Sequence, residues 1–301
     1  MARTKKEPKQ AQQAAPEAAA PEDIVEIPEI TVEKEKEPAP VIVDPEAAIV
    51  IPAASTKEIE SWTPKTEIGK KVKAGQLTDL KQIFEQGGRV QESQIIDALM
   101  PGAETDLLLV GQAKGKFGGG QRRVFKQTQK KTMEGNKPKF SAYAVVGNRN
   151  GFVGLGKGKA KETVPAREKA FRNARLNIRM IRRGCGSWQC NCRQPHSVPY
   201  TVVGSCGSVR VKLIPAPKGK GLIAEKECQK ILRLAGIKDV WTKTFGNVGT
   251  KANLILACMD ALEQLMKTKT LPVHIETLGI VDGPAGATGV YETPAEPAVV
   301  E

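Results

Sequence analysis

The sequence predicts an α+β protein with two modules, and three features of its apolar pattern support this. Apolar residues alternate with a period of two on both sides of a turn at 147–150, which indicates a β-hairpin. From Pro165 to about Arg183 the period changes to 3.6, which predicts a helix packed on that hairpin. A second run of two strands, a helix, a strand and a helix follows between residues 198 and 283.

The remaining elements follow from the same periods and from the turn residues between them. In the first module, 61–183, we expect helices over 79–85 and 94–99 and strands over 106–111, 122–128, 140–146 and 151–156. Residues 130–139 contain Gly135 and Pro138 and are predicted to form an irregular polar connection. In the second module, 198–283, we expect strands over 198–203, 209–214 and 239–244 and helices over 224–234 and 250–266.

The ends of the chain and the segment between the modules differ from the modules in composition. Residues 1–60 and 284–301 are rich in Ala, Pro and Glu and keep no helix or strand period. We therefore expect disordered tails, the first of them acidic. Residues 184–197 are interpreted as a linker that holds three cysteines.

The charge distribution indicates a nucleic-acid partner. The chain has 46 Lys and Arg against 33 Asp and Glu, and 20 of the basic residues but only 3 of the acidic ones lie within 112–183. Such a density of one sign repels itself unless a polyanion neutralises it. There is no apolar run of about 20 residues and no signal peptide, so neither a membrane partner nor secretion is expected. Six cysteines are too few for a disulfide scaffold.

Two glycine-rich segments are candidates for phosphate contact. The first, 151–158, has the spacing of a P-loop, but Gly158 stands where that motif needs Ser or Thr, so nucleotide hydrolysis is not expected. We expect its glycines to let the backbone approach a phosphate chain, with Lys157, Lys159 and Lys161 at a helix N-terminus. A flexible connector with solvated lysines is the alternative. The second segment is the loop 114–123, whose glycines and basic residues suit insertion into RNA.

The predicted helix after Pro165 also carries arginines at helical spacing. Arg172, Arg175, Arg179 and Arg182 would form a stripe beside the apolar one, with no acidic residue between 173 and 183. Because guanidinium groups bind phosphate in a bidentate manner, we predict that this stripe contacts RNA. The candidate RNA-binding residues are Lys114, Lys116, Gly118, Gly119, Gly120, Arg122, Arg123, Lys126, Arg149, Lys157, Lys159, Lys161, Arg172, Arg175, Arg179, Arg182, Arg183, Lys218 and Lys220.

The linker contains a pattern of metal ligands, Cys185, Cys190, Cys192 and His196. Three thiols and one imidazole within twelve residues can enclose one tetrahedral zinc ion. All four positions would be filled by protein, which predicts a structural zinc site rather than a catalytic one. The alternative is that Cys185 and Cys190 are reduced core residues and that His196 contacts RNA.

The sequence gives little support for catalysis. It has two histidines, no Gly-x-Ser-x-Gly motif, and few carboxylates where the basic residues are dense. A zinc-dependent RNA-modifying enzyme would need an open metal position and a general base, and the sequence identifies neither. We therefore predict a non-enzymatic RNA-binding protein without a small-molecule substrate. A free-standing RNA chaperone or assembly factor shares every charge feature and stays open.

Several strings resemble the S-five family of universal small-subunit ribosomal proteins. They are Val145–Gly147 with Gly151–Ala160, then Pro195–Pro199, and the Leu-Ile-Pro-Ala-Pro-Lys-Gly-Lys-Gly string at 213–221. The segments 185–192 and 235–244 are similar to the archaeal form of the family. The resemblance covers roughly residues 75–270, and residues 1–60 have no counterpart in the usual core of the family.

This resemblance implies an N-terminal domain similar to the double-stranded-RNA-binding fold (βββα), a C-terminal ββαβα domain and a place in the cytoplasmic ribosome. It implies contacts with small-subunit rRNA, with neighbours of the S-four and S-eight families, and with mRNA at the entry channel near the decoding region. Its projecting glycine-rich basic hairpin, which is associated with translational accuracy, maps onto Lys114–Arg123. Its Gly-Lys-Gly-Lys segment maps onto Gly156–Lys159.

Overall fold

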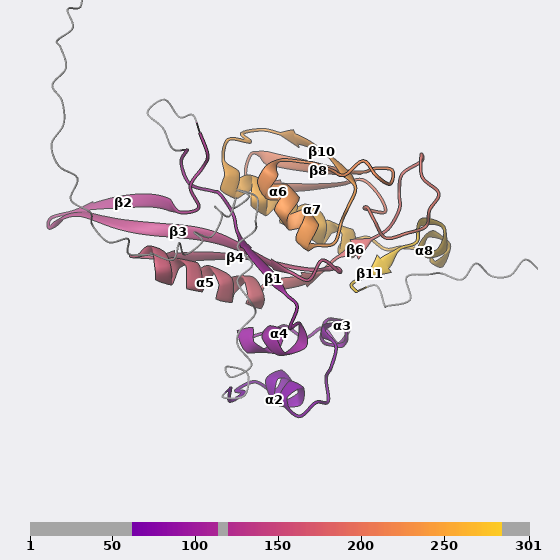
Figure 1. The fold of residues 1–301 in the computed structure, drawn as a ribbon, viewed down its shortest axis with the longest axis horizontal. Helices are drawn as coiled ribbons and strands as arrows, with labels where there is room; N and C mark the ends of the chain where they lie inside the picture. The colour runs from indigo at the N-terminus through magenta and orange to yellow at the C-terminus, as the bar shows by residue number, and fades with distance from the viewer. Residues whose placement is uncertain (1–61, 114–119, 285–301) are drawn as a thin grey trace, which may run out of the picture. The chain divides into compact units, whose positions relative to one another are not determined.

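The computed structural model describes residues 62–113 and 120–284, which contain two main sheets with helices packed on them (Figure 1). The chain divides at Pro45 into two compact units, so all of these residues belong to the unit Glu46–Glu301. Residues 1–61, 114–119 and 285–301 lie outside the described part. The prediction of disordered tails therefore falls almost entirely on residues that are not described.

The first sheet is antiparallel and built around one long strand. Its strands are β1 (Glu104–Leu107), β2 (Lys126–Thr132), β3 (Gly135–Gly147), β4 (Phe152–Ala160) and β5 (Ile178–Met180). The order is β1-β3-β4-β5, and β2 pairs with the part of β3 that β1 leaves free. Helix α5 (Thr163–Leu176) covers one face (Figure 1). The short helices α2 (Glu67–Lys73), α3 (Leu80–Glu85) and α4 (Ser93–Leu99) share an apolar core with α5 and that face.

Alternate glycines in β4 allow α5 to lie directly on the strand. A Cβ atom on any of three of these glycines would overlap backbone atoms of α5. The helix presents an alanine at every fourth position to them, and all three alanines are fully buried. The expectation that these glycines open the backbone to a phosphate is therefore wrong, because α5 occupies their face. The facing residues are Gly154, Gly156 and Gly158 on β4 and Ala166, Ala170 and Ala174 on α5.

The second sheet confirms the predicted order of two strands, a helix, a strand and a helix. Its strands are β7 (Val202–Cys206), β8 (Val209–Pro215), β9 (Leu222–Ile223) and β10 (Val240–Phe245), arranged β7-β8-β10-β9. Helices α6 (Lys226–Leu234) and α7 (Lys251–Lys267) pack into its core. After α8 (Pro272–Leu278), strand β11 (Val281–Asp282) pairs with β6 (Arg182–Arg183), so the end of the second module returns to the end of the first.

The predicted helix to Arg183 is too long. Helix α5 ends at Leu176, and Asn177 caps it with a non-helical backbone. Beyond Asn177 the burial alternates, with Ile178 buried, Arg179 exposed and Met180 half-buried, and this segment pairs with the free edge of β4. The apolar spacing is compatible with a helix or a strand, and the free edge of β4 makes this segment a strand.

Residues 130–139 form most of a hairpin rather than an irregular connection. Strands β2 and β3 pair from Lys126↔Ser141 to Thr132↔Gly135. Pro138 is tolerated because β4 begins to pair only at Phe140, so at this position β3 has a neighbour on one side alone. Within the described residues, no helix is long and apolar enough to cross a membrane.

Candidate nucleic-acid interface and metal centre

The hairpin β2–β3 and strand β4 carry exposed lysines on the sheet face opposite α5. Directly paired residues share a face, so the pairs Lys126↔Ser141, Ser141↔Lys159 and Tyr143↔Lys157 lie on one side. The alternation that turns the β4 glycines toward α5 turns the lysines between them away from it. We call this group the lysine face; it consists of Lys126, Lys130, Lys137, Lys139, Lys157 and Lys159, all exposed.

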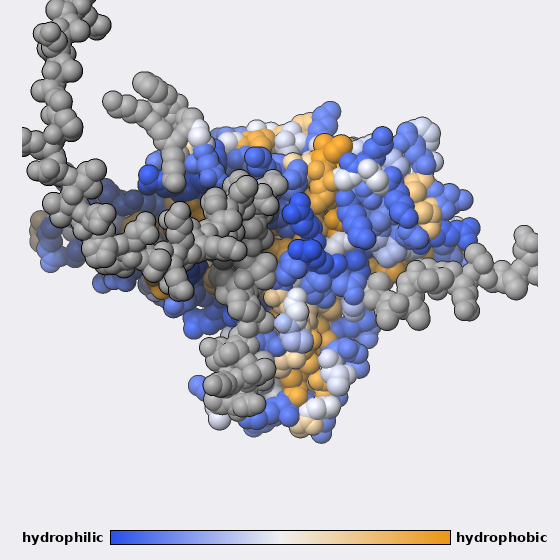
Figure 2. Space-filling model, in the orientation of Figure 1, coloured by the Kyte–Doolittle hydropathy of each residue, from blue (hydrophilic) through white to orange (hydrophobic). Residues whose placement is uncertain are grey.

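The lysine face has almost no compensating charge. Glu134, in the turn between β2 and β3, pairs with Lys137, and within the described residues no ion pair is formed by the other five lysines. Lys130 and Lys137 lie directly opposite each other, a like-charge arrangement that destabilises a sheet, and of the two only Lys137 has an acidic partner within the described residues. Figure 2 shows that the part of the hairpin left uncovered in this view is mostly hydrophilic.

The same sheet face changes from basic to apolar along β3. Tyr143 and Val145 on β3 and Leu155 on β4 are buried, and they belong to the core that includes the second sheet. Lys157 stands at the boundary, with its Nζ 5.6 Å from the centroid of the Tyr143 ring, a cation–π distance. The inner half of this face therefore fixes the hairpin on the second module, and the outer half presents the lysines.

The structure places the predicted lysines of β4 differently from the sequence-based expectation. Lys157 and Lys159 lie within β4, not at the N-terminus of α5, and only Lys161 lies in the turn before that helix. Lys130, Lys137 and Lys139 were missed because the segment 130–139 was interpreted as an irregular connection. Alternating Lys and Thr at 126, 128 and 130 is the signal that could have identified a strand there.

The predicted arginine stripe is not one surface. Arg172 is exposed on α5, but Arg175 pairs with the buried Asp97 at 2.9 Å. Arg179 lies on β5 and its Nε is 3.6 Å from Glu263 Oε1. These two contacts join α5 to α4 and β5 to α7, so they are packing contacts.

The two arginines of β6 are buried. Arg182 donates from Nε and Nη2 to the Asp282 carboxylate, at 2.6 and 2.9 Å, and from Nη1 to the carbonyl of Thr268 at 2.7 Å. Arg183 is 5% exposed and donates to Asn150 Oδ1 at 2.7 Å. In this chain neither guanidinium is free for bidentate phosphate contact.

The other candidate RNA-binding residues lie in loops. Arg149 is in the turn between β3 and β4 and pairs with Glu104 at 2.7 Å. Lys218 and Lys220 are exposed after β8, and Lys218 Nζ donates to Gln194 Oε1 at 3.0 Å. Of the loop 114–123, the structure describes Gly120, Arg122 and Arg123, near an isolated bridge between Ala113 and Arg122. Lys114, Lys116, Gly118 and Gly119 lie outside the described residues.

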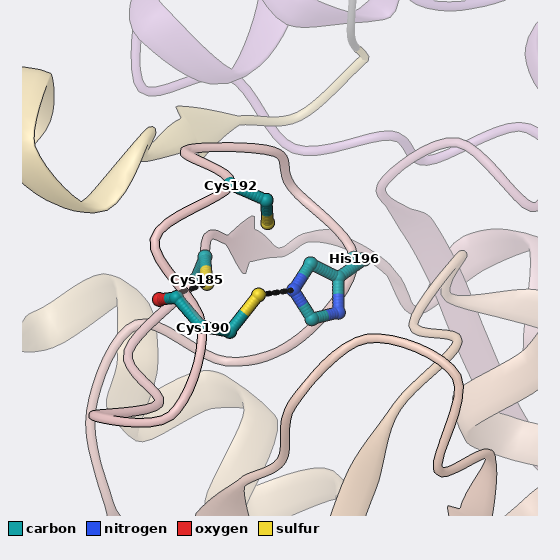
Figure 3. Close-up of side chains that lie close together, drawn as sticks. All are labelled: Cys185, Cys190, Cys192 and His196. Atoms are coloured by element: carbon teal, nitrogen blue, oxygen red, sulfur yellow. Dashed lines mark hydrogen bonds between the residues drawn. The ribbon is translucent and has the colours of Figure 1, made fainter.

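The linker folds its three cysteines and histidine into one cluster (Figure 3). The three Sγ atoms and a ring nitrogen of His196 all lie within 4.8 Å of one another, and Cys190 Sγ is 3.8 Å from His196 Nε2. Zn–S bonds of about 2.3 Å and Zn–N bonds of about 2.0 Å place tetrahedral ligand atoms at separations of this size. The donor set Cys185, Cys190, Cys192 and His196 therefore fits one zinc ion by type and by geometry.

A hydrogen bond to Asp239 orients the histidine of this cluster. Asp239 Oδ2 is 2.9 Å from His196 Nδ1, so a proton on Nδ1 leaves Nε2 free for a metal. The other oxygen of Asp239 accepts from Gly221 N at 2.8 Å, and the carbonyl of His196 accepts from Lys238 N and Asp239 N. Asp239 could not be predicted as the partner of His196, because residues 43 positions apart carry no local signal for such a pair.

The thiols of the cluster differ in acidity. The backbone N–H of Lys218 lowers the pKa of Cys190 to about 6, and burial raises the pKa of Cys185 to about 12. At neutral pH a thiolate is therefore available at Cys190, whereas Cys185 keeps its proton unless a cation is bound. Metal ligation requires thiolates, so a metal ion would be the partner that makes ionisation at Cys185 favourable.

An α+β chain with an exposed basic sheet face and a closed ligand cluster has the features of a nucleic-acid-associated protein with a structural metal site. Two family models match it: "Ribosomal protein S5, N-terminal domain" over residues 121–182 and "Ribosomal protein S5, C-terminal domain" over residues 204–273. The first match begins at Gln121, so most of the loop 114–123 lies outside it.

Curated relatives agree with the family models. The small ribosomal subunit protein uS5 of Methanocaldococcus jannaschii is 47% identical over 225 residues, which cover 75% of this chain and 97% of the relative. The protein of the same name from Nanoarchaeum equitans is 44% identical over 225 residues, covering 75% and 96%. The chain therefore belongs to the ribosomal protein S5 family, in its archaeal type. It is a structural constituent of the small subunit of the cytoplasmic ribosome and not an enzyme.

Proposed function

We propose that this chain binds small-subunit rRNA through the lysine face, and that the metal cluster fixes the linker that joins its two modules. The single observation that carries the first part is the set of six exposed lysines on one sheet face with one carboxylate beside them. An RNA backbone supplies the negative charge at regular spacing that such a face requires.

The hairpin β2–β3 is the element best suited to reach into folded RNA. Its strands are exposed over nearly the whole length of β2 and over residues 135–139 of β3. It belongs to the segment that matches the N-terminal family model, in which three antiparallel strands precede α5. This order supports a variant of the double-stranded-RNA-binding fold, with module boundaries near 61–183 and 198–283. The projecting basic hairpin that the resemblance implies stays assigned to Lys114–Arg123, of which residues 114–119 lie outside the described part, and β2–β3 is a second basic hairpin that follows it in the chain.

The family resemblance extends this proposal to the surroundings of the protein. It supports a position near the mRNA entry channel and the decoding region, beside proteins of the S-four and S-eight families. A role in subunit assembly and in translational accuracy follows from that position. The alternative, a free-standing RNA chaperone, predicts that the chain leaves the particle in high salt, whereas a ribosomal constituent sediments with the small subunit.

The proposed metal is one structural zinc ion held by Cys185, Cys190, Cys192 and His196. Four protein ligands leave no open position for water or substrate, so the ion would act by cross-linking the linker. The cluster contacts the second module through the Asp239–His196 hydrogen bond and through the backbone of Lys218. Bound zinc would thereby hold residues 185–196 against the loop that carries Lys218 and Lys220.

The RNA-binding proposal predicts a large change in salt dependence on loss of the lysine face. A variant with Lys126, Lys139, Lys157 and Lys159 replaced by Gln should bind small-subunit rRNA with a log K versus log salt slope smaller by about three to four, because each phosphate contact contributes roughly one. Filter binding over a range of salt concentrations measures this slope.

The control carries the same loss of charge elsewhere on the surface. Lys70, Lys71, Lys267 and Lys269 are exposed and lie on or beside α2 and α7, away from the lysine face. Their replacement by Gln should leave the slope nearly unchanged. Equal slopes for the two quadruple variants would contradict the assignment of this face.

A further inference from the structure

A basic cavity lies where a turn of the first module meets the end of helix α6. Its volume is about 430 Å³. Arg149 contributes from the turn between β3 and β4, and Arg233 and Lys238 contribute from the C-terminal end of α6 and the residues after it. The rest of the lining comes from Gln229 and from Gly221, Leu222, Gly236 and Ile237. The cavity is distinct from the lysine face, which lies on the outer strands of the first sheet.

The charge of this cavity is of one sign. None of its lining residues is acidic. Arg233 and Lys238 are exposed and form no ion pair within the part of the chain that the structure describes. Arg149 pairs with Glu104 at 2.7 Å, but its side chain stays 55% exposed. The pair engages Nε and Nη2 of Arg149, so it is Nη1 that this exposed side chain can offer to a further anion.

A buried guanidinium lies behind the lining. Arg183 Nη1 is 3.4 Å from the carbonyl of Gly236, which is itself a lining residue. Its Nη2 donates to Asn150 Oδ1 and to the carbonyl of Gly283, and its buried Nε has no hydrogen-bond partner. Among the described residues no carboxylate forms an ion pair with it. Burial lowers the pKa of Arg183, yet a guanidinium stays charged, so an uncompensated positive charge lies under the cavity.

The strained backbone conformation of Arg149 indicates that its side chain has a role that a glycine could not fill. Its φ of 56° lies in the left-handed region, which favours glycine or asparagine and costs an arginine about 1 kcal/mol or more. The Arg149 N–H donates to the carbonyl of Leu234 at 2.9 Å, so the turn is fixed on the end of α6. A glycine would make the same backbone contact without strain. The backbone contact thus does not explain an arginine here.

We propose that this cavity binds a phosphate group, with Arg149, Arg233 and Lys238 as its direct ligands and Arg183 as the buried charge beneath them. The proposal rests on the proposed RNA-binding function insofar as an RNA backbone is one source of that phosphate; a free phosphate ion is the other. Because residues from both modules line the site, a bound phosphate would fix the turn at Arg149 to the end of α6.

The test uses the full chain and a triple variant, Arg149→Gly, Arg233→Gln and Lys238→Gln. Glycine suits the φ of position 149, so the variant keeps its fold. The control triple variant is Arg210→Gln, Lys226→Gln and Lys267→Gln, which removes three exposed charges that line no part of this cavity. One arm measures affinity for small-subunit rRNA by filter binding, and the other measures the Tm gain from inorganic phosphate against chloride at equal ionic strength.

We expect the cavity variant to bind rRNA about tenfold more weakly than wild type at moderate salt, with a log K versus log salt slope smaller by about one. The control variant should change the rRNA affinity by less than about threefold. A cavity-specific loss in the rRNA arm assigns the site to the RNA backbone, and a loss in the phosphate arm alone assigns it to the free ion. Equal behaviour of the two triple variants in both arms overturns the proposal. Absence of rRNA binding by wild type would instead contradict the proposed function. The phosphate arm would still show whether the cavity binds a phosphate ion.

Discussion

Replacing Gly156 with alanine is expected to lower the free energy of unfolding by about 3 kcal/mol, at the upper end of overpacking effects. The added Cβ would overlap the backbone N of Ala174 and the backbone O of Ala170 in α5. Backbone atoms cannot rotate away as side-chain ends can, so the helix must retreat from β4 and lose part of its buried contact with the sheet. Urea denaturation of the two proteins measures the difference.

The control for this prediction is Gly102→Ala. A Cβ at Gly102 meets nothing within 4 Å, and its φ is not positive, so this variant should change stability by less than about 1 kcal/mol. If Gly156→Ala kept wild-type stability and instead weakened RNA binding, the glycines of β4 would serve a phosphate and not α5. That outcome would restore the interpretation that the sequence alone suggested.

Removal of the metal is expected to lower stability by an amount comparable to that of Gly156→Ala. The purified chain should contain one zinc per molecule, and Cys190→Ser should contain none, because the thiolate with the lowered pKa is lost. At a free zinc concentration about a thousandfold above the dissociation constant, bound metal stabilises the fold by about 4 kcal/mol, so the variant should lose most of that amount. Elemental analysis and thermal unfolding with and without a chelator give both quantities.

Cys206→Ser is the matched control for the metal prediction. Cys206 ends β7, is half-buried, and lies outside the ligand cluster. This variant should keep its zinc and its sensitivity to chelators. If wild type contains no metal, the three linker cysteines are reduced packing residues, and hydrogen bonds such as Asp239–His196 and Lys218–Gln194 tie the linker to the second module.

Much of the fold could be predicted from the sequence because its local signals are strong. The turn at 147–150, the strands on either side of it, and the helices near 226–234 and 251–267 all follow from period and turn residues. The limit of helix α5 could not be predicted, since Ile178 fits a helical stripe as well as it fits the edge of β4. Only the three-dimensional fold brings that strand edge into reach.

The candidate site was predicted in part for the same reason. The four candidate metal ligands lie within twelve residues, so their spacing alone indicated the cluster. The arginines were assigned to RNA because charge was visible in the sequence and its partners were not. Asp97, Glu263 and Asp282 lie far away along the chain, yet they neutralise Arg175, Arg179 and Arg182. The lysine face emerged only from the register of β2 on β3.

The most direct test of the central claim is to map where rRNA touches the protein. Small subunits assembled with this chain would be irradiated to cross-link RNA to protein, and the cross-linked peptides identified by mass spectrometry. We expect adducts on the lysine face, in the peptides that contain Lys126, Lys139, Lys157 or Lys159, and none on α2 around Lys70. Adducts confined to α2 and the exposed side of α5, with the β2–β3 hairpin unmodified, would contradict it.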